Sequence, residues 1–471
     1  MGTIVPSGST SVTPSYGRLR RRLLVTVVAL VVVAALVVAG LLFLRGDDVT
    51  PDAADGPGAV LPDVGAPAPV LAALPDDAPA PDPDALGTLL TPLLAAPALG
   101  GGVSAEVVDV AGGRTLFALG ADDPVTPAST AKLLTAAAAL TAIDPEDTLE
   151  TRVVAGAGPG EVVLVGGGDP TLSTTAPSLT YPGAPTVADL AAQVRAALPA
   201  GAAVTRVVVD NSLFEGPLTA EGWGPEDAPS TYAAPVTATA VDGARLRPGE
   251  DPRSGAPGTD AGRALAAALS VPGATVELGA APEGAETLGS VRSAPVARLV
   301  EQALSQSDNL LAESLSRHVA LASDLPATFD GAAQAVTGAL EEAGLDVSDV
   351  ELYDGSGLSR LDLVTPAVLT ELLGGAADGS LAGASAVLSG LAVAGYDGTL
   401  ADRGDPAAPP GTVRAKTGTL LGVHGLAGTV VTADGRLLAY ALVANGTSGG
   451  GGPEEAALDA VASAMAACGC S

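Results

Sequence analysis

Lysine, histidine and cysteine are nearly absent from the 471-residue sequence, and each scarcity limits the chemistry open to the chain. The two histidines, His318 and His424, lie far apart and form no His-Glu-x-x-His motif. The two cysteines, Cys468 and Cys470, are too few and too close together for a zinc site. We interpret them as a feature of the C-terminal tail, with a disulfide or a link to a partner as the less favoured alternative. The sequence therefore disfavours a zinc peptidase and predicts no metal.

Basic residues are scarce as well, with 22 Lys and Arg against 53 Asp and Glu, for a formal net charge of −31. This charge argues against a nucleic-acid partner, because its phosphates would be repelled. Only two of the basic residues are lysines, Lys132 and Lys416. Arginine keeps its proton in proteins, whereas a desolvated lysine can lose it and act as a base. We therefore expect both lysines to take part in chemistry.

A run of 22 apolar, uncharged residues occupies Leu23–Leu44, directly after four arginines between positions 18 and 22. At a rise of about 1.5 Å per residue, such a helix spans a bilayer. Arginines beside a span stay in the cytoplasm, so we expect residues 1–22 to be a cytoplasmic tail and residues 23–44 a single-pass anchor in the cell membrane. The rest would be extracytoplasmic. A cleaved signal peptide is the alternative, but the run is long and no clean Ala-x-Ala site follows.

Composition divides the rest of the chain into three parts. Pro, Ala, Gly and Asp dominate residues 45–85, which predicts a disordered tether because such a segment buries too little apolar surface to fold. Residues 86–150 and 286–471 are expected to form one split catalytic domain. Between them, residues 151–285 show short strands, loops and one helix near Val187–Leu198, which predicts an inserted smaller domain.

The split domain is predicted to be α+β, with helices around an antiparallel sheet that also takes in the N-terminal strands. Its strands are expected at 103–110, 115–119, 412–420, 426–431 and 437–444. Its helices are expected at 86–94, 295–304, 310–321, 331–343, 366–373 and 453–467, together with one that begins near Thr126.

The first candidate site is Ser129-x-x-Lys132, for which Thr126 is expected as the helix N-cap and Pro127 as the first helical residue. Residues three apart on a helix share a face, so the amine of Lys132 can reach the hydroxyl of Ser129. Unpaired amides in the first turn favour a deprotonated serine and an oxyanion. Neighbouring alanines and leucines would desolvate Lys132 and lower its pKa, as a base requires. Alone, this spacing is more often incidental.

The second candidate, Ser307-Asp308-Asn309, lies between two predicted helices and holds one of only three asparagines in the chain. The serine hydroxyl can relay a proton to a leaving amine, and the asparagine amide can orient a peptide carbonyl. The same residues can instead cap the helix that begins at Leu310. The two roles are compatible.

The third candidate, Lys416-Thr417-Gly418-Thr419, lies on the first strand of the C-terminal meander. Lys416 and Thr417 can bind a substrate carboxylate through charge and a hydroxyl. Gly418 has no side chain, so a substrate backbone could approach and pair along an edge strand. The amide of Thr419 can supply an oxyanion donor. The alternative is an ordinary strand start with a bulge.

In chain order the three candidates form the signature of class A β-lactamases and penicillin-binding proteins. Because they use both lysines of the chain, coincidence explains them poorly. With further segments, the sequence from about residue 88 onward resembles the D-alanyl-D-alanine carboxypeptidase/endopeptidase family of low-molecular-mass penicillin-binding proteins. The further segments are GGGDPTL (166–172), DNSLF (210–214), YAAPV (232–236), SDNLLAE (307–313), DGSGLSR (354–360) and GTL (398–400).

The resemblance implies a penicillin-binding-protein/β-lactamase-like transpeptidase fold with an insertion between the first two motifs. Ser129 and Ser307 are 178 positions apart, more than in β-lactamases and less than in larger family members, so one inserted domain is expected. Ser129 would be the acylated nucleophile and Lys132 its base. Ser307 and Asn309 would relay a proton and position the substrate.

The same resemblance implies that Lys416, Thr417 and Thr419 hold the terminal carboxylate and complete the oxyanion hole. Asp354 and Ser356 are interpreted as parts of a structural turn, with a place along the cleft as the less favoured alternative. The implied function is a serine-type D-alanyl-D-alanine carboxypeptidase, or endopeptidase, that acts on peptidoglycan stem peptides without a cofactor and is inhibited by β-lactams. A serine β-lactamase and a non-catalytic wall-binding envelope protein remain as alternatives. Oligomeric state is left open.

Overall fold

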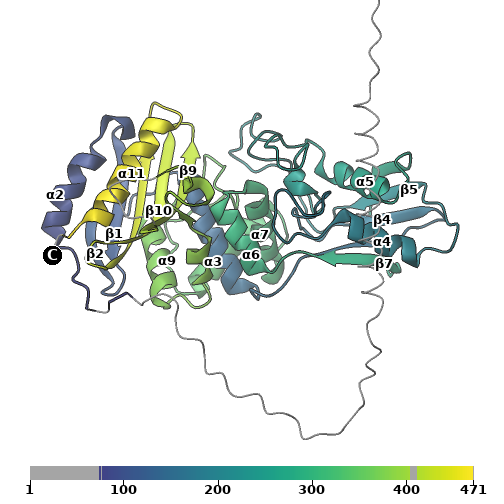
Figure 1. The fold of residues 1–471 in the computed structure, drawn as a ribbon, viewed down its shortest axis with the longest axis horizontal. Helices are drawn as coiled ribbons and strands as arrows, with labels where there is room; N and C mark the ends of the chain where they lie inside the picture. Colours follow the sequence, from purple (N-terminus) through teal and green to yellow (C-terminus); the bar gives the residue numbers. More distant parts are fainter. Residues whose placement is uncertain (1–73, 76, 404–410, 470–471) are drawn as a thin grey trace, which may run out of the picture. The chain divides into compact units, whose positions relative to one another are not determined.

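The computed structural model describes residues 74–75, 77–403 and 411–469. Among these residues, six strands form the larger sheet in the order β2-β1-β11-β10-β9-β8, with antiparallel neighbours throughout (Figure 1). The N-terminal hairpin thus joins the C-terminal meander, as predicted. The strands are β1 (Gly102–Asp109), β2 (Arg114–Leu119), β8 (Ala392–Val393), β9 (Val413–Leu420), β10 (Val423–Val431) and β11 (Leu437–Asn445).

Helices cover both faces of this sheet (Figure 1). On one face, Leu90 of one helix and Val461 of another meet the sheet's leucines, and these two helices are α2 (Pro83–Leu94) and α11 (Gly452–Ala467). On the other face the strands present small side chains, Ala427, Ala439 and Ala441. Small residues let helices approach closely, and here they receive α3 (Lys132–Ala142) and α9 (Pro366–Asp378).

Helix α3 lies at the centre of the helical layer. Every residue from Lys132 to Leu140 is buried, so the helix makes contacts on all sides. Its Ala-rich sequence fits this place, because alanine favours helix and fills little space. The neighbouring helices are α6 (Val296–Ser305), α7 (Asn309–Ala322), α8 (Phe329–Glu342) and α10 (Ala386–Gly390).

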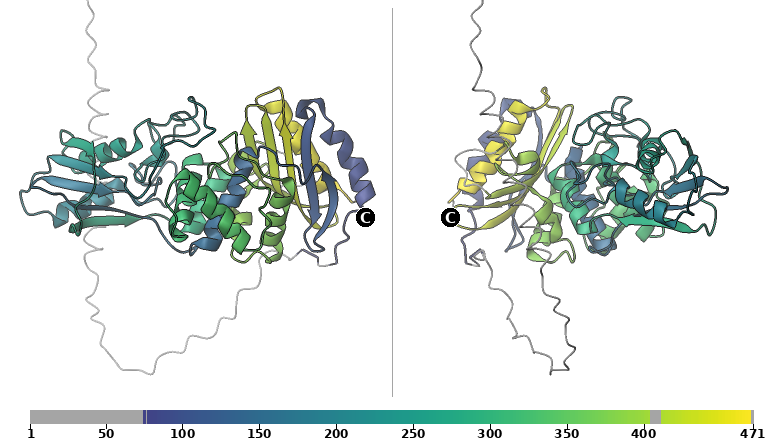
Figure 2. Two further views of the ribbon diagram at one scale, coloured as in Figure 1. Left: turned by 180° about the vertical axis from the view of Figure 1, so that it is seen from behind. Right: turned by 45° about the vertical axis from the view of Figure 1, so that its right-hand side comes forward.

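A second sheet of five strands lies in the chain between α3 and α6, in the order β6-β5-β4-β3-β7. The β4–β5 and β5–β6 pairs are parallel, whereas β3 pairs antiparallel with both β4 and β7. Figure 2 shows this sheet with its helices from two further directions. The elements are β3 (Glu150–Ala155), β4 (Glu161–Val165), α4 (Val187–Ala197), β5 (Arg206–Asp210), α5 (Pro257–Ala268), β6 (Thr275–Leu278) and β7 (Thr287–Arg292).

The prediction of a single helix in this part of the chain was wrong, because α5 is a second one. Its sequence contains Gly258 and Gly262, which lower helix propensity and obscured the pattern. The reason for Gly262 is packing: a Cβ there would lie 2.6 Å from side-chain atoms of Val209 and Val276 on the sheet. The close approach of α5 to its sheet therefore requires Gly262, although glycine lowers helix propensity.

The helices and strands expected in the split domain are present, with ends shifted by a few residues. Helix α2 begins at Pro83 rather than at residue 86, because Asp82 accepts hydrogen bonds from the amides of Asp84 and Ala85.

Cys468 takes part in a disulfide, which was the less favoured interpretation. The short elements α10 and β8 were not anticipated.

The predicted anchor at residues 23–44 and most of the predicted tether lie outside the described residues. Within the part of the chain that the structure describes, no helix has the length and apolar character needed to cross a bilayer.

Candidate active site

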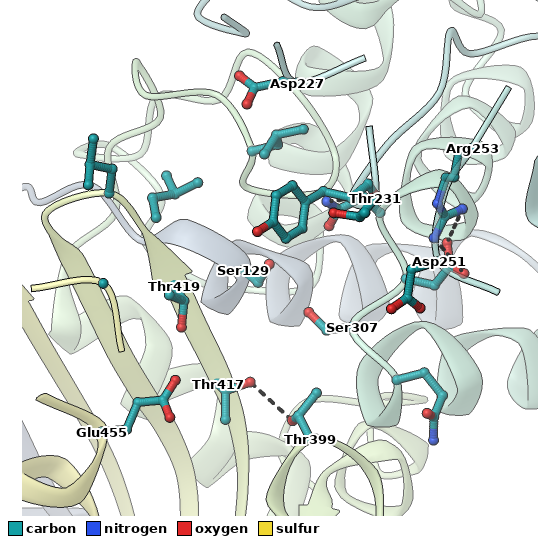
Figure 3. A pocket seen from close by; sticks show the side chains of 18 of the residues that line it. Ser129, Asp227, Thr231, Asp251, Arg253, Ser307, Thr399, Thr417, Thr419 and Glu455 are labelled. Carbon is teal, nitrogen blue, oxygen red and sulfur yellow. Dashed lines mark hydrogen bonds and ion pairs between the residues drawn. The ribbon is translucent and has the colours of Figure 1, made fainter. Parts of the chain in front are cut away.

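A cavity of about 690 Å³ brings the three sequence motifs together (Figure 3). Its walls include five residues that the sequence singled out: Ser129, Ser307, Asn309, Thr417 and Thr419. They come from the turn before α3, the α6–α7 junction and β9. Segments almost 300 residues apart in the chain thus meet at one site.

Ser129 lies on a short 3₁₀ turn, Ala128–Ala131, and α3 begins only at Lys132. The prediction of Thr126 as N-cap and Pro127 as first helical residue was therefore wrong. Ala128 adopts the left-handed region, at φ 49°, which no regular helix start allows. This conformation turns the chain sharply and leaves the Ser129 side chain at the cavity, partly exposed.

Lys132 is 1% exposed, and its ammonium group donates three hydrogen bonds. The acceptors are Ser129 Oγ at 2.9 Å, Asn309 Oδ1 at 2.6 Å and the carbonyl oxygen of Ser356 at 2.6 Å. Burial lowers the pKa of Lys132 to about 8, although nearby carboxylates, chiefly Asp354, oppose the shift. The predicted contact between the first-motif lysine and serine is confirmed.

The segment after Asp354 holds Lys132 in place. The Asp354 carboxylate accepts hydrogen bonds from the amides of Ser356 (3.0 Å), Gly357 (2.6 Å) and Ser359 (2.7 Å). This fixes the Ser356 carbonyl as an acceptor for Lys132. Asp354 and Ser356, interpreted from the sequence as a turn, therefore also help to hold the ammonium group of Lys132 in place.

Gly357 also packs against the turn that carries Ser129. Its φ is +76°, and a Cβ there would lie 2.0 Å from the carbonyl oxygen of Ala128. The Asp-Gly-Ser-Gly pattern could have indicated this close packing from the sequence, because a glycine at left-handed φ that lies against another backbone segment is hard to replace.

Glu313 is a charged neighbour of Lys132 that was not singled out from the sequence as a site residue. It lies on α7, is fully buried, and accepts from the amide of Gly355 at 3.1 Å. Burial raises the pKa of Glu313 to about 7, and the negative charge of Asp354 adds to the effect. Its counterion is Arg317, one turn later at 3.5 Å. Together these charges set the electrostatic environment beneath Lys132.

Ser307 and Lys416 form the second serine–lysine pair. Lys416 is fully buried, and its ammonium group donates to Ser307 Oγ and to the carbonyl oxygen of Thr417, both at 2.8 Å. Burial lowers the pKa of Lys416 well below its usual range, and the nearby charge of Lys132 lowers it further. Lys416 does not line the cavity, whereas Ser307, which it contacts, does.

Asn309 is the first residue of α7, whose N-cap is Asp308, as the sequence allowed. The Asn309 Oδ1 atom accepts from Lys132, and its Nδ2 donates to the carbonyl oxygen of Tyr232 at 3.3 Å. The Asn309 side chain thus joins Lys132 to a loop that borders the cavity.

Thr417 and Thr419 face the cavity from an unpaired edge of β9 (Figure 3). Strand β8 pairs only with Arg414 and Ala415, so no described strand covers the edge from Lys416 onward. The Thr417 hydroxyl donates to Thr399 Oγ1 at 3.0 Å, and Thr399 also lines the cavity. This edge can receive an extended peptide.

Gly418 has a packing role that was not expected from the sequence. A Cβ there would lie 2.9 Å from the carbonyl oxygen of Pro127 and 3.3 Å from the Ala128 Cβ. The missing side chain therefore makes room for the turn that carries Ser129. Among the described residues, no group of His, Cys, Asp and Glu side chains is arranged to hold a metal ion.

Comparisons with known proteins agree with this geometry. The model of the D-Ala-D-Ala carboxypeptidase 3 (S13) family matches residues 87–257 and 250–467. The chain is 41% identical over 406 residues to carboxypeptidase DacB of Mycolicibacterium smegmatis, covering 83% of this chain and 86% of that protein. It is 40% identical over 380 residues to a carboxypeptidase of Mycobacterium tuberculosis, covering 79% and 81%.

The fold is similar to that of penicillin binding protein 4 of Haemophilus influenzae, with a TM-score of 0.66 at 22% sequence identity. The match covers 80% of this chain and 97% of that one. Because the family model matches most of the sequence, the chain belongs to the D-Ala-D-Ala carboxypeptidase 3 (S13) family.

Proposed function

We propose that this protein is a serine-type D-alanyl-D-alanine carboxypeptidase, which removes the terminal D-alanine of peptidoglycan stem peptides through an acyl-enzyme on Ser129. The observation that carries the proposal is the 2.9 Å contact between Lys132 Nζ and Ser129 Oγ at the edge of a cavity. A second buried lysine holds the hydroxyl of Ser307 at the same cavity. One pair activates a nucleophile and the other serves the leaving group.

Acylation begins when Lys132 is neutral. With a pKa of about 8, a useful fraction of this amine lacks its proton near neutral pH and takes the proton of Ser129. The Ser129 oxygen then attacks the carbonyl carbon of the penultimate D-alanine. The amides of Ser129 and Thr419 stabilise the oxyanion, and each such donor is worth about 3 kcal/mol.

The leaving amine needs a proton before the peptide bond breaks. Ser307 donates its hydroxyl proton to the D-alanine nitrogen and recovers one from Lys416, 2.8 Å away. The proton that Lys132 took from Ser129 is then returned to Lys416 by way of solvent, so that Lys132 is neutral again and can act as a base in the next step. The departing D-alanine leaves space for a water molecule. Water attacks the ester of Ser129, its proton passes to Lys132 or Ser307, and the Ser129 hydroxyl is restored.

The substrate's terminal carboxylate is assigned to the hydroxyls of Thr417 and Thr419. Both line the cavity, on the strand edge that follows Lys416. Lys416 adds positive charge from behind the strand, as in the role expected from the sequence. Placing the carboxylate there aligns the peptide antiparallel or parallel to β9 and brings its carbonyl to Ser129.

The most direct test is D-alanine release. Purified protein incubated with a synthetic acyl-D-Ala-D-Ala peptide is expected to release one D-alanine per peptide, measured by a D-amino-acid oxidase assay. A matched peptide ending in L-Ala-L-Ala is the control and should remain intact. Cleavage of a cross-linked stem-peptide dimer into its two stem peptides would show endopeptidase action as well. Hydrolysis of a cephalosporin faster than of the peptide would instead favour the β-lactamase alternative.

We also propose that residues 23–44 anchor the chain in the cell membrane, with residues 86–150 and 286–471 as the extracytoplasmic catalytic domain and 151–285 as its insertion. The support is the uncharged run of 22 residues preceded by arginines. The full chain expressed in a bacterial host is expected in the membrane fraction and to resist a salt wash. A chain that starts at residue 74 should become soluble and keep its activity. Release of the full chain by salt would contradict the anchor.

A further inference from the structure

Asp308, the middle residue of the second motif, takes no part in the steps above, yet it is tightly held. Its side chain is 3% exposed, and it accepts from the amide of Leu311 at 3.2 Å as the cap of α7. It also accepts from the Tyr181 hydroxyl at 2.7 Å and pairs with two guanidinium groups. A helix cap needs only the first of these contacts.

Both guanidinium groups come from the segment between the first two motifs. Arg253, 4% exposed, places Nη1 and Nη2 at 3.4 and 3.3 Å from the two carboxylate oxygens of Asp308. Arg245 places Nη2 at 3.5 Å and donates from Nη1 to Tyr181 at 3.0 Å. The two arginines pair across an antiparallel β-bridge, so one loop delivers both charges.

The turn that Asp308 belongs to is strained and carries both catalytic contacts. Ser307 has a φ of +54°, in the left-handed region that disfavours a residue with a side chain. On one side of Asp308, Ser307 accepts from Lys416; on the other, Asn309 accepts from Lys132. A shift of this turn would therefore lengthen both lysine contacts at once.

We propose that Arg253 and Arg245 are positioning residues: they clamp Asp308 and so hold Ser307 and Asn309 against the two lysines. We call these three charged residues the Asp308 clamp. The inference rests on the proposed acyl-transfer function and gives the segment 151–285 a direct part in it. Burial alone would raise the pKa of Asp308, but the two arginines hold this pKa below its usual range. The Asp308 carboxylate therefore stays charged near neutral pH.

The test compares acylation by a fluorescent penicillin in the full-length protein and in two variants, Arg253→Met and Asp308→Asn. Rapid mixing separates the dissociation constant of the initial complex from the acylation rate constant. Both variants are expected to lower the rate constant about 10- to 100-fold, because misplacing a supporting group by about 1 Å costs that much. The dissociation constant should change far less.

The pH profile separates positioning from a general loss of structure. Lys132 feels opposite charges from the clamp: Asp308 raises its pKa and Arg253 lowers it. The acid limb of the acylation rate should therefore move to higher pH in Arg253→Met and to lower pH in Asp308→Asn. The other charges facing Lys132 are the same in both variants: Asp354, Glu313 and Lys416.

Matched variants complete the experiment. Arg247→Met removes an exposed arginine of the same loop, whose ion pair within the described residues is with Glu250, and should acylate like the wild type. Arg253→Lys keeps the charge and should recover part of the rate; it also serves if Arg253→Met fails to fold. Acylation rates within about twofold of the wild-type rate in Arg253→Met and Asp308→Asn would overturn the inference. So would acid limbs of the two pH profiles that move in the same direction. A wild-type protein that forms no adduct would instead refute the proposed function.

Discussion

The Ser129→Ala variant is expected to form no covalent adduct with penicillin and to release D-alanine at least about a million-fold more slowly than the wild type. Removing a nucleophile of this kind eliminates the acyl-enzyme and leaves only what the oxyanion donors and binding contribute. A β-lactam offers the same carbonyl as the dipeptide, but its leaving group stays attached and hinders the incoming water. Intact-mass measurement after penicillin treatment should show one added inhibitor mass on the wild type and none on the variant.

An exposed serine gives the control for this measurement. Ser389 lies on α10, away from the cavity, and Ser389→Ala should be labelled like the wild type. Thermal midpoints of the two variants should match, because Ser129 is partly exposed and its loss leaves only one Lys132 contact unmade. An adduct on the Ser129→Ala protein, traced by peptide mapping to Ser307, would show that the wrong serine has been assigned.

The residues that meet at the candidate site were easier to predict from this sequence than the local backbone geometry. Lys132 and Lys416 stood out because desolvated lysine has a use that arginine cannot fill, and both are buried lysines that contact a serine. The period of apolar residues likewise predicted the strands that carry the third motif. Each of these signals depends on residue type or spacing alone, which a sequence displays directly.

Features that depend on contacts between distant segments were not accessible in this way. The left-handed Ala128 has a side chain that gives no hint of its φ, and it is the packing of Gly357 and Gly418 around it that allows the turn. Arg245 and Arg253 look like two surface arginines until the fold brings them to Asp308, more than 50 positions away. Only a three-dimensional arrangement distinguishes such residues from their many exposed counterparts.

Replacing Lys132 tests the base separately from the nucleophile. The Lys132→Arg variant keeps a positive charge and hydrogen-bond donors but cannot give up its proton near neutral pH. Acylation of Ser129 is expected to fall about 10²- to 10⁴-fold, the range that general-base catalysis usually contributes. Slow labelling on Ser129 should persist, in contrast to the Ser129→Ala variant. If Lys132 acted only as a fixed charge, the arginine variant would acylate nearly as fast as the wild type.

The pH dependence of acylation is a second test of Lys132 as the base, because it can be measured in the wild type as well as in the variant. Burial brings the pKa of Lys132 from its usual 10.5 down to about 8, so the neutral amine becomes abundant as the pH rises through that value. The wild-type acylation rate should therefore increase with pH and level off above about 8, whereas the Lys132→Arg variant should lack this rise. Thermal midpoints must accompany the rates, because arginine is larger than the site and leaves the acceptors on Asn309 and Ser356 imperfectly paired. A rise of equal size in both proteins would assign the titration to another group and remove Lys132 from the role of base.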